Sequence, residues 1–301
     1  MSELKLSQFK AFNLVDQKLL KTKFEKYQPQ ASEYCFSYFF SWQNYYGYKW
    51  TIYKDWLLIL SQEKNKPTCF LQPIGTESRA AITLELLKWL KEQNPDSNPF
   101  INRADERLVS ELQNSSKFKI EEKRDYFDYI YNLQDLATLK GRKYHSKRNH
   151  INKFNSRYSY SYENINADNI PACRAIEQKW CKLKDCDKDE SKQAERKALF
   201  RTLDNYKDLA LIGGIISVEG DYEAFSIGEM LNDNMVVVHY EKADPEISGL
   251  YQFINKKFCD NIDSDIQHVN REQDLGISGI RKAKQSYHPS HFAKKYKITL
   301  K

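Results

Sequence analysis

Long hydrophobic runs are missing from this chain of 301 residues. The longest apolar stretch, LALIGGIISV at 209–218, is too short to span a bilayer and is typical of a buried strand. The opening residues, MSELKLSQFKAFN, lack the apolar core of a signal peptide. We therefore expect a cytoplasmic protein without a transmembrane segment.

The spacing of metal ligands is also missing from the six cysteines and six histidines. Cys173, Cys181 and Cys186 match no zinc-ribbon pattern and have no histidine partners nearby. We therefore expect no metal site and disfavour a metal hydrolase. A disulfide framework is not typical of a chain this long, so we expect all six cysteines to be reduced thiols.

Common phosphate-binding signatures are absent as well. No GxxxxGK[ST] motif is present, which argues against a P-loop nucleotidase, and the chain has no RRM or KH signature. The net charge of +6 is nevertheless compatible with an anionic partner.

Acidic residues are absent from residues 140–157, KGRKYHSKRNHINKFNSR, which include seven Lys or Arg. In a helical projection at 100° per residue, Lys140, Lys143 and Lys147 lie in a sector that overlaps that of Tyr144, Ile151 and Phe154. An ordinary surface helix would have its lysines and its apolar residues on opposite faces. We therefore interpret this segment as a basic helix that borders a cleft. A solvated charged face and lysine stems covering a core edge remain open. The predicted phosphate-binding residues are Lys140, Arg142, Lys143, Lys147, Arg148 and Asn149.

A shift of 168 residues aligns the two halves of the chain. CFLQPIG at 69–75 falls on VVHYEKA at 237–243, and FINR at 100–103 falls on HVNR at 268–271. Three apolar residues at helical spacing also coincide in each half: Ile82, Leu86 and Leu90 with Leu250, Ile254 and Phe258. We interpret these matches as a duplicated unit.

Periodicity and turn residues predict the elements of both halves. In the first half we expect helices at 16–27, 31–46 and 76–92, strands at 48–60 and 68–72, and then a strand, a helix and a strand to about 131. In the second half we expect a strand near 158–162, helices from Pro171 and over 190–207, strands at 209–218, 222–230 and 235–241, a helix at 246–260, a strand ending at VNR, a helix over GISGIRKAK and a final strand, KYKITL. This order resembles the GNAT acyltransferase fold, an α/β (α+β) fold with a mixed central sheet flanked by helices. We therefore expect a GNAT-like domain at 1–133, a basic linking helix at 134–157 and a second GNAT-like domain at 158–301.

Charged residues are also dense in VNREQDLGISGIRKAKQSYHP at 269–289. Helix capping and surface salt bridges explain part of this pattern, and we accept that explanation for Lys282. For Arg271, Asp274 and Lys284 we favour a functional role, because strand ends beside a cleft commonly carry ligand contacts.

The two dense motifs, together with HYEKADPEISGLYQFIN at 239–255, resemble the DUF2156 family. That family is similar to the C-terminal domain of phosphatidylglycerol lysyltransferases. The resemblance implies a tandem GNAT fold, akin to Fem-type peptidyltransferases, that moves an aminoacyl group from tRNA to a lipid hydroxyl. It also suggests that Lys284, followed by Tyr287 and Pro289, contacts donor or acceptor. The lipid synthases carry a membrane-embedded flippase ahead of this domain, so their lipid acceptor is not transferred to this chain.

The resemblance orders the candidate donors. GNAT enzymes bind the coenzyme A pyrophosphate with a glycine-rich loop, but here Gly75 and Gly249 are isolated, and Asp244 and Glu246 would repel pyrophosphate. We therefore rank aminoacyl-tRNA above acyl-CoA as the donor, with no cofactor required. A non-catalytic module that binds RNA or phospholipid is the remaining alternative, and peripheral contact with anionic lipid stays open.

Direct transfer between donor and acceptor defines the expected roles. Glu241 or Asp274 would position the acceptor or take its proton, and Arg271 and Lys284 would bind a carboxyl, phosphate or oxyanion. The basic helix would hold the tRNA. The predicted substrate-binding residues are Glu229, Asn270, Glu272, Arg281 and Tyr287. The first half lacks an equivalent of RKAKQSYHP, so we expect it to be structural or to help bind the acceptor.

Overall fold

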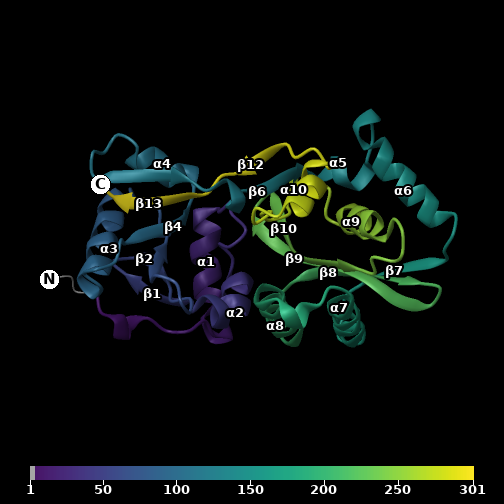
Figure 1. The fold of residues 1–301 in the computed structure, drawn as a ribbon, viewed down its shortest axis with the longest axis horizontal. Coiled ribbons are helices and arrows are strands. Elements are labelled where there is room, and N and C mark those ends of the chain that lie inside the picture. Colours follow the sequence, from purple (N-terminus) through teal and green to yellow (C-terminus); the bar gives the residue numbers. More distant parts are fainter. Residues whose placement is uncertain (1–3) are drawn as a thin grey trace. The chain divides into compact units, whose positions relative to one another are not determined.

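The computed structural model describes residues 4–301, which form two mixed β-sheets flanked by helices (Figure 1). The chain divides into two compact units. The first contains the described residues up to Asp128 together with Gln273–Ser278 and Phe292–Lys301, and the second contains Tyr129–Glu272 and Gly279–His291. Within the described part, no helix has both the length and the apolar character needed to cross a bilayer.

The first unit is built on a six-stranded sheet in the order β1-β2-β3-β4-β13-β5. Its strands are β1 Lys49–Tyr53, β2 Trp56–Ser61, β3 Cys69–Leu71, β4 Phe100–Ala104, β5 Phe118–Glu122 and β13 Tyr296–Leu300. Its helices are α1 Gln17–Tyr27, α2 Phe36–Tyr46, α3 Ala80–Gln93 and α4 Glu106–Leu112. Ile82, Leu86 and Leu90 of α3 are buried in the core of this unit, as their helical spacing predicts.

The expected single strand at 48–60 is wrong, because β1 and β2 form an antiparallel hairpin there. Lys54 and Asp55, between the paired residues Tyr53 and Trp56, both have positive φ angles, of 49° and 65°. Two-residue hairpin turns of type I′ need positive φ at both central positions, and glycine or asparagine usually marks them. Neither residue is present here, so the sequence carries no ordinary signal for this turn.

The second sheet has seven strands in the order β12-β6-β11-β10-β9-β8-β7. They are β6 Asp128–Asn132, β7 Tyr160–Asn164, β8 Ile212–Val218, β9 Asp221–Asn232, β10 Met235–Ala243, β11 His268–Asn270 and β12 His291–Ala293. The remaining helices are α5 Leu133–Thr138, α6 His145–Asn155, α7 Ile170–Leu183, α8 Glu190–Asp204, α9 Leu250–Asp260 and α10 Ser278–Gln285. The element order expected for the second half is confirmed except for β12, a short strand before the final strand that was not expected.

The duplication is visible in the topology. Each sheet contains a parallel crossover, β3-α3-β4 in the first and β10-α9-β11 in the second. The shift of 168 residues also relates β6 (128–132) to β13 (296–300). These two strands are exchanged, since β13 pairs with β4 and β5 while β6 pairs with β11, and the yellow β13 accordingly lies beside β4 in Figure 1. The observed units therefore differ from the expected domains. The expected boundaries placed β6 in the first domain and β13 in the second, whereas most of β6 belongs to the second unit and β13 to the first.

The basic segment is not one continuous helix over 134–157. Leu139 and Gly141 have positive φ angles, of 51° and 91°, and they separate α5 from a 3-10 turn at Arg142–Tyr144 that leads into α6. The whole segment belongs to the second unit. Its apolar side is buried as expected, and the ring of Phe154 lies 4.8 Å from that of Phe253 on α9.

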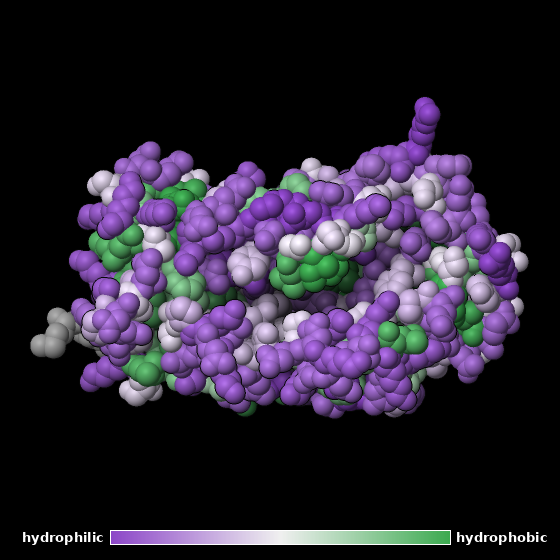
Figure 2. All heavy atoms as spheres, in the orientation of Figure 1, coloured by the Kyte–Doolittle hydropathy of each residue, from purple (hydrophilic) through white to green (hydrophobic). Residues whose placement is uncertain are grey.

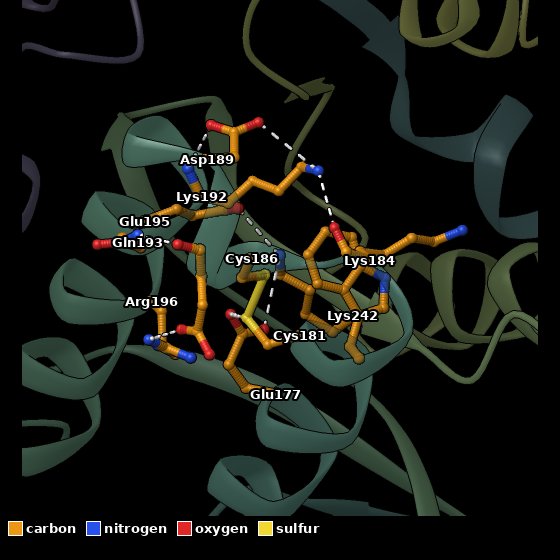
Figure 3. Close-up of a disulfide and its surroundings, with 12 residues drawn as sticks. Glu177, Cys181, Lys184, Cys186, Asp189, Lys192, Gln193, Glu195, Arg196 and Lys242 are labelled. Carbon is orange, nitrogen blue, oxygen red and sulfur yellow. Dashed lines mark hydrogen bonds and ion pairs between the residues drawn. A yellow bond between two sulfur atoms is a disulfide. The ribbon is translucent and has the colours of Figure 1, made fainter.

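The expectation that all six cysteines are free is also wrong. Cys181 and Cys186 form a disulfide, shown beside Glu177 and Lys242 in Figure 3, and the other four cysteines are free and buried. The reason is local, because α7 ends at Leu183 and the chain turns back through Asp185, which brings the two Cα atoms to 4.9 Å.

Candidate active site

Strands β10 and β11 differ in length, and β10 extends beyond the end of β11. They pair in parallel only from Met235 to Val237 and from His268 to Asn270, yet β10 continues to Ala243. Side chains that follow the last pair therefore lie where β11 has ended and β10 continues. Glu241 on β10 and Arg271 directly after β11 occupy this position.

Glu241, Arg271 and Asn255 form a connected polar group. Arg271 donates from Nη2 to Glu241 at 2.9 Å, and Asn255 on α9 donates from Nδ2 to the other Glu241 oxygen at 3.0 Å. Burial lowers the pKa of Arg271, but electrostatic interactions, with Glu241 first and then Tyr131 and Tyr287, together raise it above the ordinary value. Arg271 is thus a permanent cation. Within residues 4–301, neither Arg271 Nη1 nor Asn255 Oδ1 has a hydrogen-bond partner, and both atoms are buried.

Tyr287 joins this group to the basic segment. Its ring centroid lies 4.8 Å from the Arg271 guanidinium carbon and 3.9 Å from Lys147 Nζ. Lys147, on α6, also donates to the Ser286 hydroxyl at 2.7 Å. Burial and then repulsion from Arg271 lower the pKa of Lys147 to about 8. Lys147 can therefore exchange a proton near neutral pH.

Lys284 holds the chain on which Arg271 is mounted. Its Nζ donates to the backbone carbonyls of Arg271 at 2.5 Å and Glu272 at 3.1 Å. The Tyr131 hydroxyl in turn donates to the Lys284 carbonyl at 2.7 Å. These contacts make Lys284 a positioning residue for Arg271, and its direct contact with donor or acceptor stays a prediction.

A second polar network follows the same strands. His239, at a bulge in β10, contacts Glu229 through Nε2 at 3.0 Å and Glu272 through Nδ1 at 2.9 Å. An imidazole satisfies two carboxylates fully only when both ring nitrogens carry a proton. Asn270 accepts from the Glu272 backbone N–H at 2.7 Å. Three predicted substrate-binding residues, Glu229, Asn270 and Glu272, therefore lie in one network around a histidine.

The remaining predicted residues lie elsewhere. Asp274 belongs to the first unit, where Arg124 lies 3.5 Å away and the Gly276 N–H donates to it at 2.8 Å. It is therefore grouped with a turn and an ion pair of that unit, whereas the residues expected to act with it belong to the second. Arg281 is half-buried on α10.

Of the six predicted phosphate-binding residues, only Lys147 contacts Tyr287 in the described residues. Lys143 pairs with Asp135 at 3.0 Å, and Arg148 donates to the carbonyls of Leu139 and Gly141, so both stabilise the local fold. Asn149 contacts His145 at 3.1 Å. The other two, Lys140 and Arg142, are exposed.

Sequence reasoning missed Asn255, Tyr131 and His239 as parts of these networks. A signal for Asn255 was available, because it falls between Ile254 and Phe258 on the apolar side of an amphipathic helix. A polar residue at a core-facing position needs a hydrogen-bond partner. No comparable signal distinguished Tyr131 among the 20 tyrosines of the chain.

Known structures share this fold. A conserved protein of unknown function from Bacteroides thetaiotaomicron superposes with a TM-score of 0.91 and 35% identity, covering 97% of this chain and 99% of its own. The C-terminal DUF2156 domain of a protein described as a lysylphosphatidylglycerol synthetase, from Agrobacterium fabrum, has a TM-score of 0.63 at 11% identity, covering 95% and 91%. A tandem GNAT protein from the clavulanic acid pathway and FemX match with TM-scores of 0.52 and 0.61 at 9% and 8% identity. The expected tandem GNAT-like fold is confirmed.

Sequence comparison gives the family. An uncharacterized protein of Mycoplasmoides gallisepticum is 25% identical over 178 residues, which cover 57% of this chain and 55% of that protein. The chain thus spans about half the length of this curated relative. The family described as "Phosphatidylglycerol lysyltransferase, C-terminal" matches residues 24–299. Since that match covers nearly the whole chain, the protein belongs to the family of phosphatidylglycerol lysyltransferase C-terminal domains.

Proposed function

We propose that the protein transfers an aminoacyl group from an aminoacyl-tRNA to a hydroxyl or amine acceptor. The observation that carries the proposal is Arg271, a buried cation that lies directly after β11 and is held by Glu241 of β10, with one guanidinium nitrogen still unpaired within residues 4–301. The family name makes phosphatidylglycerol the first acceptor to test and lysyl the first transferred group. A lipid acceptor would require the protein to contact the membrane surface.

The reaction assigns a task to each residue. The acceptor oxygen or nitrogen bonds to the acyl carbon, the ester bond to the ribose oxygen breaks, and the acceptor proton passes to that oxygen. Arg271 Nη1 would stabilise the charge that develops on the carbonyl oxygen. Lys147, with its pKa of about 8, would take the acceptor proton and return it to the leaving oxygen. An aminoacyl ester is already activated, so the proposed reaction needs no cofactor.

The loop between β10 and α9 favours tRNA over acyl-CoA as the donor. In the GNAT fold this loop binds the coenzyme A pyrophosphate. Here Asp244 is buried, accepts from the Glu246 N–H at 2.8 Å and pairs with Lys179 at 2.6 Å. A carboxylate therefore already occupies a backbone donor that pyrophosphate would need.

A transfer assay tests the proposal. Purified protein would be incubated with a radiolabelled mixed aminoacyl-tRNA pool and phosphatidylglycerol vesicles, or with a cell extract as the source of acceptors. We expect label to move to an acceptor, and we expect RNase treatment of the donor to abolish the transfer. Arg271→Met should reduce the rate roughly 100-fold or more, as loss of an oxyanion donor does in other enzymes. Turnover of acyl-CoA with no transfer from any aminoacyl-tRNA would overturn the proposal.

A further inference from the structure

We infer that Asn255 and Glu241 form a recognition site for the α-amine of the transferred aminoacyl group. This inference rests on the proposed function and specifies the part of the donor that the site distinguishes. Its structural basis is a pair of buried polar atoms, Asn255 Oδ1 and Arg271 Nη1, which lack partners within residues 4–301 although each residue is fixed by Glu241.

Asn255 occupies a core-facing position of α9. It lies on α9 among the buried residues Phe253, Ile254 and Phe258, and only 1% of its surface is exposed. A carboxamide in such a position costs stability unless both of its ends are hydrogen-bonded. Its Nδ2 is satisfied by Glu241 and its Oδ1 is not, so one acceptor at this position needs a donor from outside the described chain.

The hydrogen-bonding groups around Asn255 determine which ligand is complementary to the site. The Glu241 carboxylate accepts one hydrogen bond at each oxygen and retains lone pairs for more. Asn255 Oδ1 and the Glu241 carboxylate are therefore available as hydrogen-bond acceptors. Arg271, which bonds to the same carboxylate, has Nη1 available as a donor. The complementary ligand carries an N–H group close to a carbonyl oxygen. An α-aminoacyl ester has this arrangement, because its amine and its carbonyl are on adjacent carbons.

Ligands without a free α-amine are less complementary to these groups. A simple acyl group, such as acetyl, has no N–H to give to Asn255. A free carboxylate would satisfy Arg271 but would be repelled by Glu241. An amine that has been acetylated is bulkier and keeps a single N–H, so it would satisfy this pair of acceptors poorly. The site therefore selects donors with a free α-amine.

The experiment compares aminoacyl-tRNA with the same pool after chemical N-acetylation. For the wild-type protein we expect at least a tenfold preference for the free amine, expressed mainly in KM because the amine contact is present in the ground state. Asn255→Leu should reduce this preference to within about threefold, and Asn255→Gln, which keeps both the amide donor and the amide acceptor, should retain more of it than Asn255→Leu does. Asn261→Leu is the matched control, because Asn261 is exposed at the end of the same helix and bonds to the Lys257 carbonyl.

A binding measurement separates this inference from the proposed function. Thermal unfolding of wild type and Asn255→Leu would be followed with L-amino acid methyl esters and with their N-acetylated forms. Stabilisation by free-amine esters alone, lost in Asn255→Leu, supports amine recognition even if no transfer is found. Equal effects of both ester forms, or an unchanged preference in Asn255→Leu, would mean that a buried water satisfies the amide and would overturn the inference. Absence of transfer together with amine-selective binding would reject the proposed function instead.

Discussion

Lys147 links the protonation state of the site to its proposed chemistry. Its pKa is lowered to about 8, first by burial and then by Arg271. If the neutral amine is the base, the transfer rate should rise as pH increases through about 8 and then level off. Arginine stays protonated over this range, so Lys147→Arg should remove the rise and slow transfer roughly 100-fold above pH 8. Initial rates across pH, corrected for spontaneous ester hydrolysis, measure both effects.

Lys143→Arg is the matched control for that prediction. Lys143 belongs to the same basic segment, but its hydrogen bond to Asp135 raises its pKa above the ordinary value. Its replacement should leave the pH profile unchanged. An unaltered profile in Lys147→Arg would show that the acceptor proton goes to another group.

The sequence indicated the charged residues of the site more clearly than the neutral ones. The unusual overlap of lysines with apolar residues pointed to a border position for Lys147, and the structure places its ammonium over the Tyr287 ring beside Arg271. The overlap could not distinguish Lys147 from Lys143, because the difference depends on Asp135 and the break at Leu139. A helical projection of the sequence cannot show contacts that form only when the chain turns, such as the pair between Lys143 and Asp135.

At the scale of elements, the disulfide between Cys181 and Cys186 closes the connection from α7 to α8. It spans a sequence separation of 5, so removing it with Cys181→Ser and Cys186→Ser should cost about 2 kcal/mol of unfolding free energy in the loop-entropy model. Urea denaturation with and without reductant measures this. Reductant should destabilise the wild type and leave the double variant unaffected. A thiol count of six in unreduced, denatured wild type would contradict the prediction.

The end of the chain is fixed by a buried ion cluster. Lys295, just before β13, is fully buried and lies 2.7 Å from both Glu33 and Asp128. Lys295→Met should destabilise the protein by about 3–5 kcal/mol, because it leaves the buried Asp128 carboxylate without its cation and leaves Glu33 paired with Arg103 alone. Chemical denaturation measures the change. Lys294→Met is the control, since Lys294 is partly exposed and makes a long ion pair of 3.9 Å with the exposed Glu106. Equal losses of unfolding free energy in the two variants would contradict the role of the ion cluster.

The exchanged strands mark the limit of local sequence patterns. The alternation in KYKITL predicts a strand, and β13 confirms it. Pairing partners depend on long-range contacts, and the sequence of β13 alone does not select between an edge beside β4 and one beside β11. The shift of 168 residues relates β6 to β13, but it does not predict that the two strands change places.

At the scale of the whole molecule, the predicted fold class was confirmed because it depended on element order, which periodicity specifies well. The proposed tRNA donor depends instead on surface charge. The exposed residues of the basic segment 140–157 contribute to a hydrophilic surface, at the upper right in Figure 2. Four of its cations are exposed and have no side-chain partner within the described chain: Lys140, Arg142, Lys153 and Arg157. No large apolar residue of 140–157 is exposed, which favours RNA over a membrane surface as the occupant.

Phosphate binding at this surface should be visible in the salt dependence of tRNA affinity. Removing one cation that pairs with a phosphate lowers the slope of log affinity against log salt by about 0.7–0.9. Replacing Lys140, Arg142, Lys153 and Arg157 with alanine should therefore reduce the slope by roughly 3 and weaken binding most at low salt. A control with the same change in charge uses four exposed lysines on other elements, Lys182, Lys184, Lys197 and Lys207. If both variants bind with the same slope, net charge alone attracts the RNA, and α6 is not its docking surface.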